Sequence, residues 1–203
     1  MTRHLAKLLE MLWYTSIGLF LGLHAGTILA VVETFDSSRK IDATPSLMPY
    51  ADAQFAETHN EVVAGFIAQN IFKNNGSVAL ILLGIALIAL IAYPLLIKLS
   101  GVAAIGNKVI SMLRTGLLLV CVVLMLVGAS HMTNMNKKWP SLYELDAPQG
   151  QLDKRRAAFD ASHRTSESLV GSAWFLAALA LVISPWCRRV ADTPSKAMIK
   201  EEQ

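Results

Sequence analysis

Charged side chains are scarce in this chain. They make up 16% of its 203 residues, whereas hydrophobic residues make up 54%. An ordinary soluble domain carries about 25% charged residues, so the shortage argues against that class of protein. The net charge of +3 is also small. It gives no electrostatic footprint for nucleic acid, which we exclude as a partner.

The sequence also lacks the short motifs of common soluble enzymes. It contains no G-x-S-x-G nucleophile elbow, no phosphate-binding loop and no dinucleotide fingerprint. Nothing in the spacing of the remaining acids and bases fixes a catalytic geometry. We therefore do not expect an enzyme.

Cysteine is rare, and the positions of its two copies argue against a disulfide. Cys121 falls in the middle of one apolar run, whereas Cys187 falls at the end of another. Their depths in a membrane would differ, and the pair lacks the spacing of a metal motif. We interpret both cysteines as packing residues.

Four long apolar runs are present, at residues 11–32, 77–97, 110–130 and 169–186. Each is close to the roughly 20 residues that a helix needs to cross a bilayer. The run 77–97 has no charge and no polar face, which excludes a soluble helical bundle. The first run follows Arg3 and Lys7, as a signal peptide would, but it is too long and lacks a cleavage site. The sequence predicts an all-α integral membrane protein, a four-helix transmembrane bundle with a single domain over residues 1–203.

The basic residues favour one orientation of these spans. Those on the short flanks are Arg3, Lys7, Lys98, Lys108, Arg188, Arg189, Lys196 and Lys200. Because basic residues of short loops stay in the cytoplasm, both termini are predicted to be cytoplasmic, including a tail at residues 187–203. The loops at residues 33–76 and 131–168 are then external. A basic cluster at residues 154–156 argues for the opposite orientation.

The first external loop contains a further helical pattern. Residues 36–49 are rich in Asp, Ser, Thr and Pro, which predicts a connector with turns. Residues 51–72 place apolar side chains at helical spacing opposite a polar face. This pattern predicts an additional amphipathic interfacial helix between spans 1 and 2. Asn74, Asn75 and Gly76 are predicted to end that helix before the second span.

The first apolar run carries a stripe of glycine. Gly18, Gly22 and Gly26 form two overlapping GxxxG steps. Such a stripe lets a neighbouring helix approach closely, although glycine is also common in membrane helices in general. At about 100° per residue, His24 points roughly 160° away from the middle of the stripe. We therefore expect one face of this helix to pack within the bundle and the other against another helix or a second subunit.

Four of the five histidines are predicted to lie on the external side. With the neighbouring methionines, the candidate metal ligands are His24, His59, His131, His163, Met132 and Met135. Histidine is costly inside a membrane, so a shared cofactor site is one interpretation, with His24, His131 and His163 as cofactor ligands. Methionine beside histidine suits copper. In the other interpretation each imidazole bonds to a carbonyl or hydroxyl group, and the methionines only pack.

The segment that opens the fourth run carries a recognisable pattern. Phe159, His163 and Ser166 form F-x-x-x-H-x-x-S. This pattern resembles the signature of the transmembrane-protein-205-like family, small four-span membrane proteins known in bacteria as a domain of unknown function. The A-G-F sequence at residues 64–66 is similar to the segment before that family's second span. The other three external histidines do not map to the family pattern. The resemblance implies a protein of the bacterial inner membrane without an established reaction.

Three functions are compatible with these features. The first is a structural or accessory component that packs against itself, as a homo-oligomer, or against a larger membrane complex. The second is a membrane protein that binds haem b or copper, an idea supported by analogy of fold with four-span haem and copper proteins. The third is a small transporter. It is disfavoured because the spans hold no acidic residue in mid-membrane and no interruption except Tyr93-Pro94.

Overall fold

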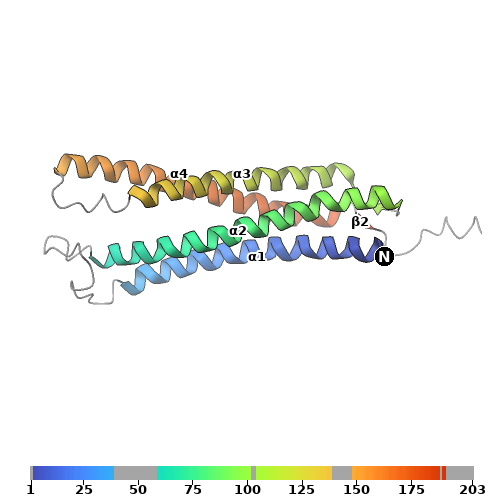
Figure 1. The fold of residues 1–203 in the computed structure, drawn as a ribbon, viewed down its shortest axis with the longest axis horizontal. Coiled ribbons are helices and arrows are strands. Elements are labelled where there is room, and N and C mark those ends of the chain that lie inside the picture. The colour runs from blue at the N-terminus through green and yellow to red at the C-terminus, as the bar shows by residue number, and fades with distance from the viewer. Residues whose placement is uncertain (1, 39–58, 102–103, 139–147, 188, 191–203) are drawn as a thin grey trace, which may run out of the picture. The chain divides into compact units, whose positions relative to one another are not determined.

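The computed structural model is built from long helices, and it describes residues 2–38, 59–101, 104–138, 148–187 and 189–190. The long elements in this part of the chain are α1 (Thr2–Ser38), α2 (His59–Ser100), α3 (Lys108–Lys138) and α4 (Gln149–Ile183), shown in Figure 1. The short elements are β1 (Ala104–Ile105), the 3-10 helix η4 (Ser184–Trp186) and β2 (Arg189–Val190). The all-α prediction is therefore confirmed for the long elements.

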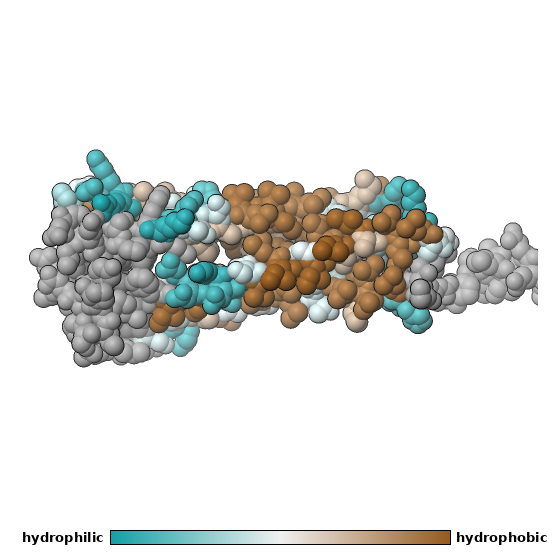
Figure 2. All heavy atoms as spheres, viewed as in Figure 1, coloured by the Kyte–Doolittle hydropathy of each residue, from teal (hydrophilic) through white to brown (hydrophobic). Residues whose placement is uncertain are grey.

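The described residues include four helical stretches that are long and apolar enough to cross a membrane, one for each long helix, and the fourth extends through η4. These stretches are His4–Ser37, Ile67–Ser100, Lys108–Met135 and Gly150–Trp186. Large aliphatic side chains are exposed on every one of the four helices, for example Leu29, Ile88, Val109 and Val182. Figure 2 shows hydrophobic side chains gathered over the middle of the helices and hydrophilic ones beyond them. Exposed apolar surface of this extent is typical of a protein that faces lipid, so the four predicted spans are confirmed as helices and indicate an integral membrane protein.

The helices extend further than the predicted spans. α2 runs without interruption through residues 74–76, so the predicted helix end at this place is wrong. Gly76 does not adopt a positive φ, which is the conformation that would have ended the helix there. Residues 59–72 accordingly form the first turns of α2, whereas residues 51–58 of the predicted interfacial helix lie outside the described residues. The connector predicted at residues 36–49 lies outside them from residue 39 onward.

The chain divides into two compact units, and each long helix contributes a segment to both. The first unit comprises Met1–Leu21, Leu80–Leu124 and Ser172–Gln203. The second comprises Gly22–Ala79 and Met125–Gly171.

The first unit has a core of a few large side chains among many small ones. Trp13, Phe20 and Leu118 are fully buried, and alanines such as Ala86 and Ala177 let neighbouring helices approach closely. Both cysteines are free and buried. The Cys121 thiol donates a hydrogen bond of 3.2 Å to the carbonyl of Ala173 on α4. These contacts agree with the interpretation of the cysteines as packing residues.

In the second unit, a polar contact links α1 to α2, and α3 approaches α4 closely. The Asn75 side-chain amide on α2 donates a hydrogen bond of 2.7 Å to the Thr27 hydroxyl on α1. Thr27 is buried, and its hydroxyl donates in turn to the carbonyl of Leu23 at 2.7 Å. On α3, a Cβ atom added to Gly128 would lie 3.2 Å from Val170 Cγ2 on α4. The absence of a side chain at this glycine is what allows the two helices to pack so closely.

A short ribbon closes one end of the first unit. Gly101 and Gly106 take positive φ values of 62° and 98° in the turn between α2 and α3. The strand β1 in this turn pairs antiparallel with β2, and Ile105 lies opposite Arg189. Asn107 then caps α3, because its side-chain oxygen accepts a hydrogen bond of 2.8 Å from the backbone N–H of Val109. The ribbon fixes both the start of α3 and the chain after α4.

Candidate functional site

The four histidines expected to form a site all belong to the second unit, each on a different long helix. His24 on α1 and His131 on α3 are half-buried, and α2 begins at His59, whose side chain lies outside the described residues. His163 on α4 is also half-buried, with 45% of its side chain accessible. Within the described part of the chain, no three His, Cys, Asp or Glu residues form a group that could hold a metal ion. The haem or copper site therefore stays a prediction.

The neighbours of His163 are local. Its Nδ1 atom lies 3.5 Å from a carboxylate oxygen of Glu167, one turn further along α4. Its ring is stacked on Phe159, one turn earlier, with 6.1 Å between centroids. The third residue of the pattern, Ser166, is buried, and its hydroxyl has no hydrogen-bond partner. The two methionines next to His131 differ, since Met132 is half-buried and Met135 is buried.

The glycine stripe of α1 faces away from the rest of the described chain. Gly18, Gly22 and Gly26 are exposed, and a Cβ atom added to any of them would meet nothing within 4 Å. The opposite side of the same helix is buried, as Ile17 and Thr27 illustrate. Gly128 differs in this respect, because it lies against another helix of its own chain. No described residue therefore covers the stripe.

A buried arginine marks a second site that the histidine pattern did not point to. Arg114 lies in the apolar span of α3, six residues after Lys108 and thus about 9 Å along the helix axis. An arginine near the end of a span usually extends toward water, but Arg114 is only 6% exposed. Its guanidinium group instead turns into the first unit. A charged group buried in a span is a strong indication of function.

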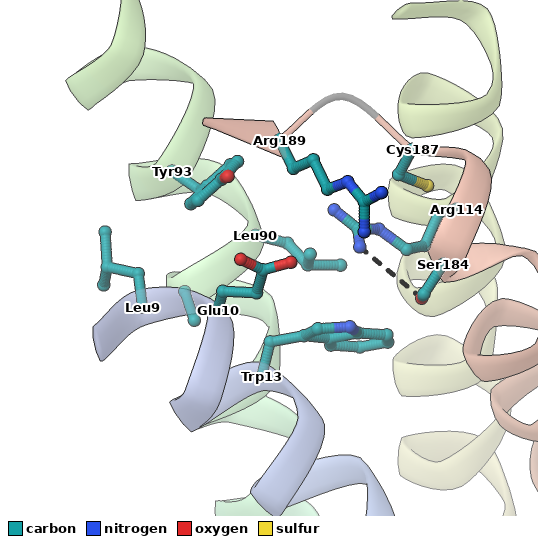
Figure 3. A pocket seen from close by; sticks show the side chains of 10 residues that line it. Leu9, Glu10, Trp13, Leu90, Tyr93, Arg114, Ser184, Cys187 and Arg189 are labelled. Carbon is teal, nitrogen blue, oxygen red and sulfur yellow. Dashed lines mark hydrogen bonds between the residues drawn. The ribbon is translucent and has the colours of Figure 1, made fainter. Parts of the chain in front are cut away.

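The partners of Arg114 come from α1 and from the end of α4. The guanidinium carbon lies 5.2 Å from the centre of the Trp13 ring, which is within the range of a cation–π contact. Nη1 donates a long hydrogen bond of 3.4 Å to the hydroxyl of Ser184, drawn as a dashed line in Figure 3. Ser184 itself donates to the Ala180 carbonyl at 2.7 Å, so its oxygen is oriented to accept from the arginine.

These contacts leave two buried donors without an acceptor. Arg114 Nε and Trp13 Nε1 are both buried, and neither has a hydrogen-bond partner. A buried donor without an acceptor costs about 1–3 kcal/mol, and more when the group is charged. Both residues line the same small cavity. We call this cavity the Arg114 pocket.

The polar residues that line the Arg114 pocket are Glu10, Trp13, Tyr93, Arg114, Ser184 and Arg189. Figure 3 shows the Glu10 carboxylate turned toward the guanidinium groups of Arg114 and Arg189. The pairing of β1 with β2 is what holds Arg189 at this end of the unit. The cavity is small, with room for about one water molecule.

Cys187 also lines the Arg114 pocket and is 2% exposed. Burial raises the pKa of the Cys187 thiol, and the Arg114 guanidinium and a hydrogen bond with Ser111 lower it by less. The thiol is therefore protonated at neutral pH and packs as a small apolar group, which argues against a nucleophilic role.

The residues expected from the sequence to bind a cofactor or metal do not line the Arg114 pocket. One signal could have revealed it. Arg114 is the single charged residue in the apolar run 110–130. Its partners Trp13 and Ser184, by contrast, stand far away in the chain, and no spacing rule connects them to Arg114.

Comparison of the chain with protein-family models, with curated proteins and with solved structures found no match. The resemblance to the transmembrane-protein-205-like family thus rests on Phe159, His163 and Ser166, and it stays a prediction.

Proposed function

We propose that this protein is an accessory component of a membrane assembly that associates through the glycine face of α1. The partner is a second copy of the chain or another membrane subunit. The observation that carries the proposal is the open space over Gly18, Gly22 and Gly26 on an apolar helix whose opposite side is buried.

The physical reason lies in how helices associate in lipid. Lipid tails are as apolar as leucine, so burying apolar side chains gives little gain there, and close contact between backbones matters more. A GxxxG stripe allows that contact because it lacks side chains. The other exposed residues of α1 include large aliphatic groups such as Leu19 and Ile28, which suit lipid. The stripe is therefore the part of this helix best suited to another helix.

The proposal includes a placement in the membrane. The four helices cross the bilayer of a bacterial inner membrane with both termini in the cytoplasm, as the basic residues of the short flanks favour. The Arg114 pocket then lies toward the cytoplasmic side, and the four histidines lie toward the external side. The first turns of α2, from His59 to the start of the apolar stretch at Ile67, lie at the external surface.

The test compares substitutions at two open glycines. Gly22→Leu fills the centre of the stripe, whereas Gly84→Leu adds the same side chain to α2, where there is also nothing within 4 Å and no stripe. Energy transfer between fluorescently labelled copies in liposomes measures self-association. Co-purification of a tagged chain from its native membrane measures binding to other subunits. We expect Gly22→Leu to lower one of the two signals by about tenfold, and Gly84→Leu to change neither.

One outcome would contradict the proposed association. If Gly22→Leu and Gly84→Leu leave both signals at the level of the unsubstituted protein, the glycine face is not used for association. The proposed function then loses its support.

A further inference from the structure

We propose that the Arg114 pocket binds the phosphate group of an anionic lipid headgroup. This inference needs the helices to lie in a membrane, as proposed above, but it does not depend on association through the glycine face. It follows from three features of the pocket: its unpaired donors, its charge and its place along the helices.

Two buried N–H groups of the pocket lack an acceptor. Arg114 Nε and Trp13 Nε1 belong to side chains that are 6% and 1% exposed, and both atoms lack an acceptor. The single hydrogen bond from Arg114 to Ser184 is long, at 3.4 Å. The pocket therefore offers several N–H groups to one incoming acceptor. A phosphate oxygen suits such a site, because arginine binds phosphate through parallel, charge-assisted hydrogen bonds.

The charge of the pocket has the matching sign. Two guanidinium groups, from Arg114 and Arg189, and the single carboxylate of Glu10 line the pocket, which leaves one positive charge in excess (Figure 3). A phosphodiester carries one negative charge and would balance it. The Glu10 carboxylate competes with the phosphate for the same arginines. Removal of its charge should therefore strengthen the binding of phosphate.

The pocket also lies where headgroups lie. Arg114 stands near one end of the apolar span of α3. The exposed Trp186 is the last residue of the fourth apolar span, and the exposed Arg189 follows it. Tryptophan and arginine are typical of the boundary between hydrocarbon and water, and basic pockets at this depth bind lipid phosphates. The small space inside the pocket admits about one oxygen atom. The rest of the headgroup then stays outside, next to Arg189.

The experiment uses the full chain in a mild detergent and counts bound lipids by native mass spectrometry. The probes are short-chain phosphatidylglycerol, which is anionic, and short-chain phosphatidylcholine, whose choline repels Arg189. The substitutions in the pocket are Arg114→Lys, Arg189→Gln and Glu10→Gln. Arg164→Gln is the matched control, because it removes an exposed arginine of α4 outside the pocket.

We expect phosphatidylglycerol to bind about tenfold more tightly than phosphatidylcholine, because both lipids carry the phosphate but only phosphatidylcholine brings a second cation next to Arg189. Arg114→Lys and Arg189→Gln should each weaken phosphatidylglycerol by roughly three- to tenfold, and Glu10→Gln should strengthen it by a similar factor. Arg164→Gln should leave binding unchanged. Added inorganic phosphate separates the sources. If it displaces the lipid at similar concentration, free phosphate is the ligand; if it does not, the headgroup is.

The proposal is overturned if the two lipids bind equally, or if Arg189→Gln and Glu10→Gln leave the binding of phosphatidylglycerol unchanged. These two positions are exposed or half-buried, so they decide the outcome even if Arg114→Lys fails to fold. Failure here leaves the glycine-face proposal intact, because Gly22→Leu is measured by association and not by lipid.

Discussion

Arg114 shows how one residue in an apolar span is stabilised. An isolated arginine in hydrocarbon costs about 2.5–3.5 kcal/mol by insertion measurements, so its group must reach water or find partners. Here the partners are the Trp13 ring at 5.2 Å and the Ser184 hydroxyl at 3.4 Å. They leave Arg114 Nε without an acceptor, and an anion in the pocket would supply one.

A substitution at Gly128 tests the close packing of α3 on α4. We expect Gly128→Leu to destabilise the protein by about 1–3 kcal/mol, because even a Cβ atom there would lie 3.2 Å from Val170 Cγ2. Gly116→Leu on the same helix is the control, since nothing lies within 4 Å of it. Thermal unfolding in detergent measures both. Equal melting temperatures for the two variants would contradict the close approach of these helices.

The continuity of α2 is the main finding at the scale of the elements. A sequence of two asparagines and a glycine usually ends a helix, yet α2 continues from His59 to Ser100. The Asn75 side chain offers a reason, because it donates a hydrogen bond to Thr27 on α1 instead of capping its own helix. A contact between helices thus outweighs the local preference of these residues.

Gly76→Ala distinguishes a continuous helix from an ended one. Within a helix, alanine is more favourable than glycine by about 0.5–1 kcal/mol, and nothing lies within 4 Å of the added Cβ atom. We therefore expect a higher melting temperature. Gly101→Ala is the matched control, because Gly101 has φ +62° and alanine there should destabilise by about 1 kcal/mol. A loss of stability in Gly76→Ala would show that the helix ends at this place.

At the scale of the whole molecule, the four long helices expose more apolar surface than a water-soluble protein does. This surface suits contact with lipid. An even number of spans returns the chain to the side on which it began. The start of α1 and the start of α4 should then lie on opposite sides of the membrane, with three spans between them.

Labelling of introduced cysteines tests this topology. His4→Cys and Gln151→Cys replace exposed residues near the start of α1 and of α4. A membrane-impermeant maleimide should label Gln151→Cys from outside intact cells, and His4→Cys only in inverted vesicles. The unsubstituted protein is the control, because Cys121 and Cys187 are buried and should react slowly. Labelling of both variants from the same side would contradict the four-span topology.

The sequence by itself determined the four apolar spans and their helical nature. Their apolar runs are long, and the run 77–97 has no charge. Such a run can cross lipid as a helix, because a helix satisfies the hydrogen bonds of its own backbone. The sequence also identified the glycine stripe, because a repeat every four residues always falls on one face of a helix. The ends of the helices were harder to predict, since charged residues such as those at 154–156 continue a helix outside a membrane as easily as they form a loop.

Only the tertiary structure decided which residues meet. The Arg114 pocket combines Glu10, Trp13, Arg114 and Ser184 from three parts of the chain, and their contact depends on the register between helices. Side-chain periodicity does not fix that register, because any apolar face packs acceptably against several others. The same reason explains why the stripe was visible in the sequence, whereas its outward direction became clear only when the buried side of α1 was known.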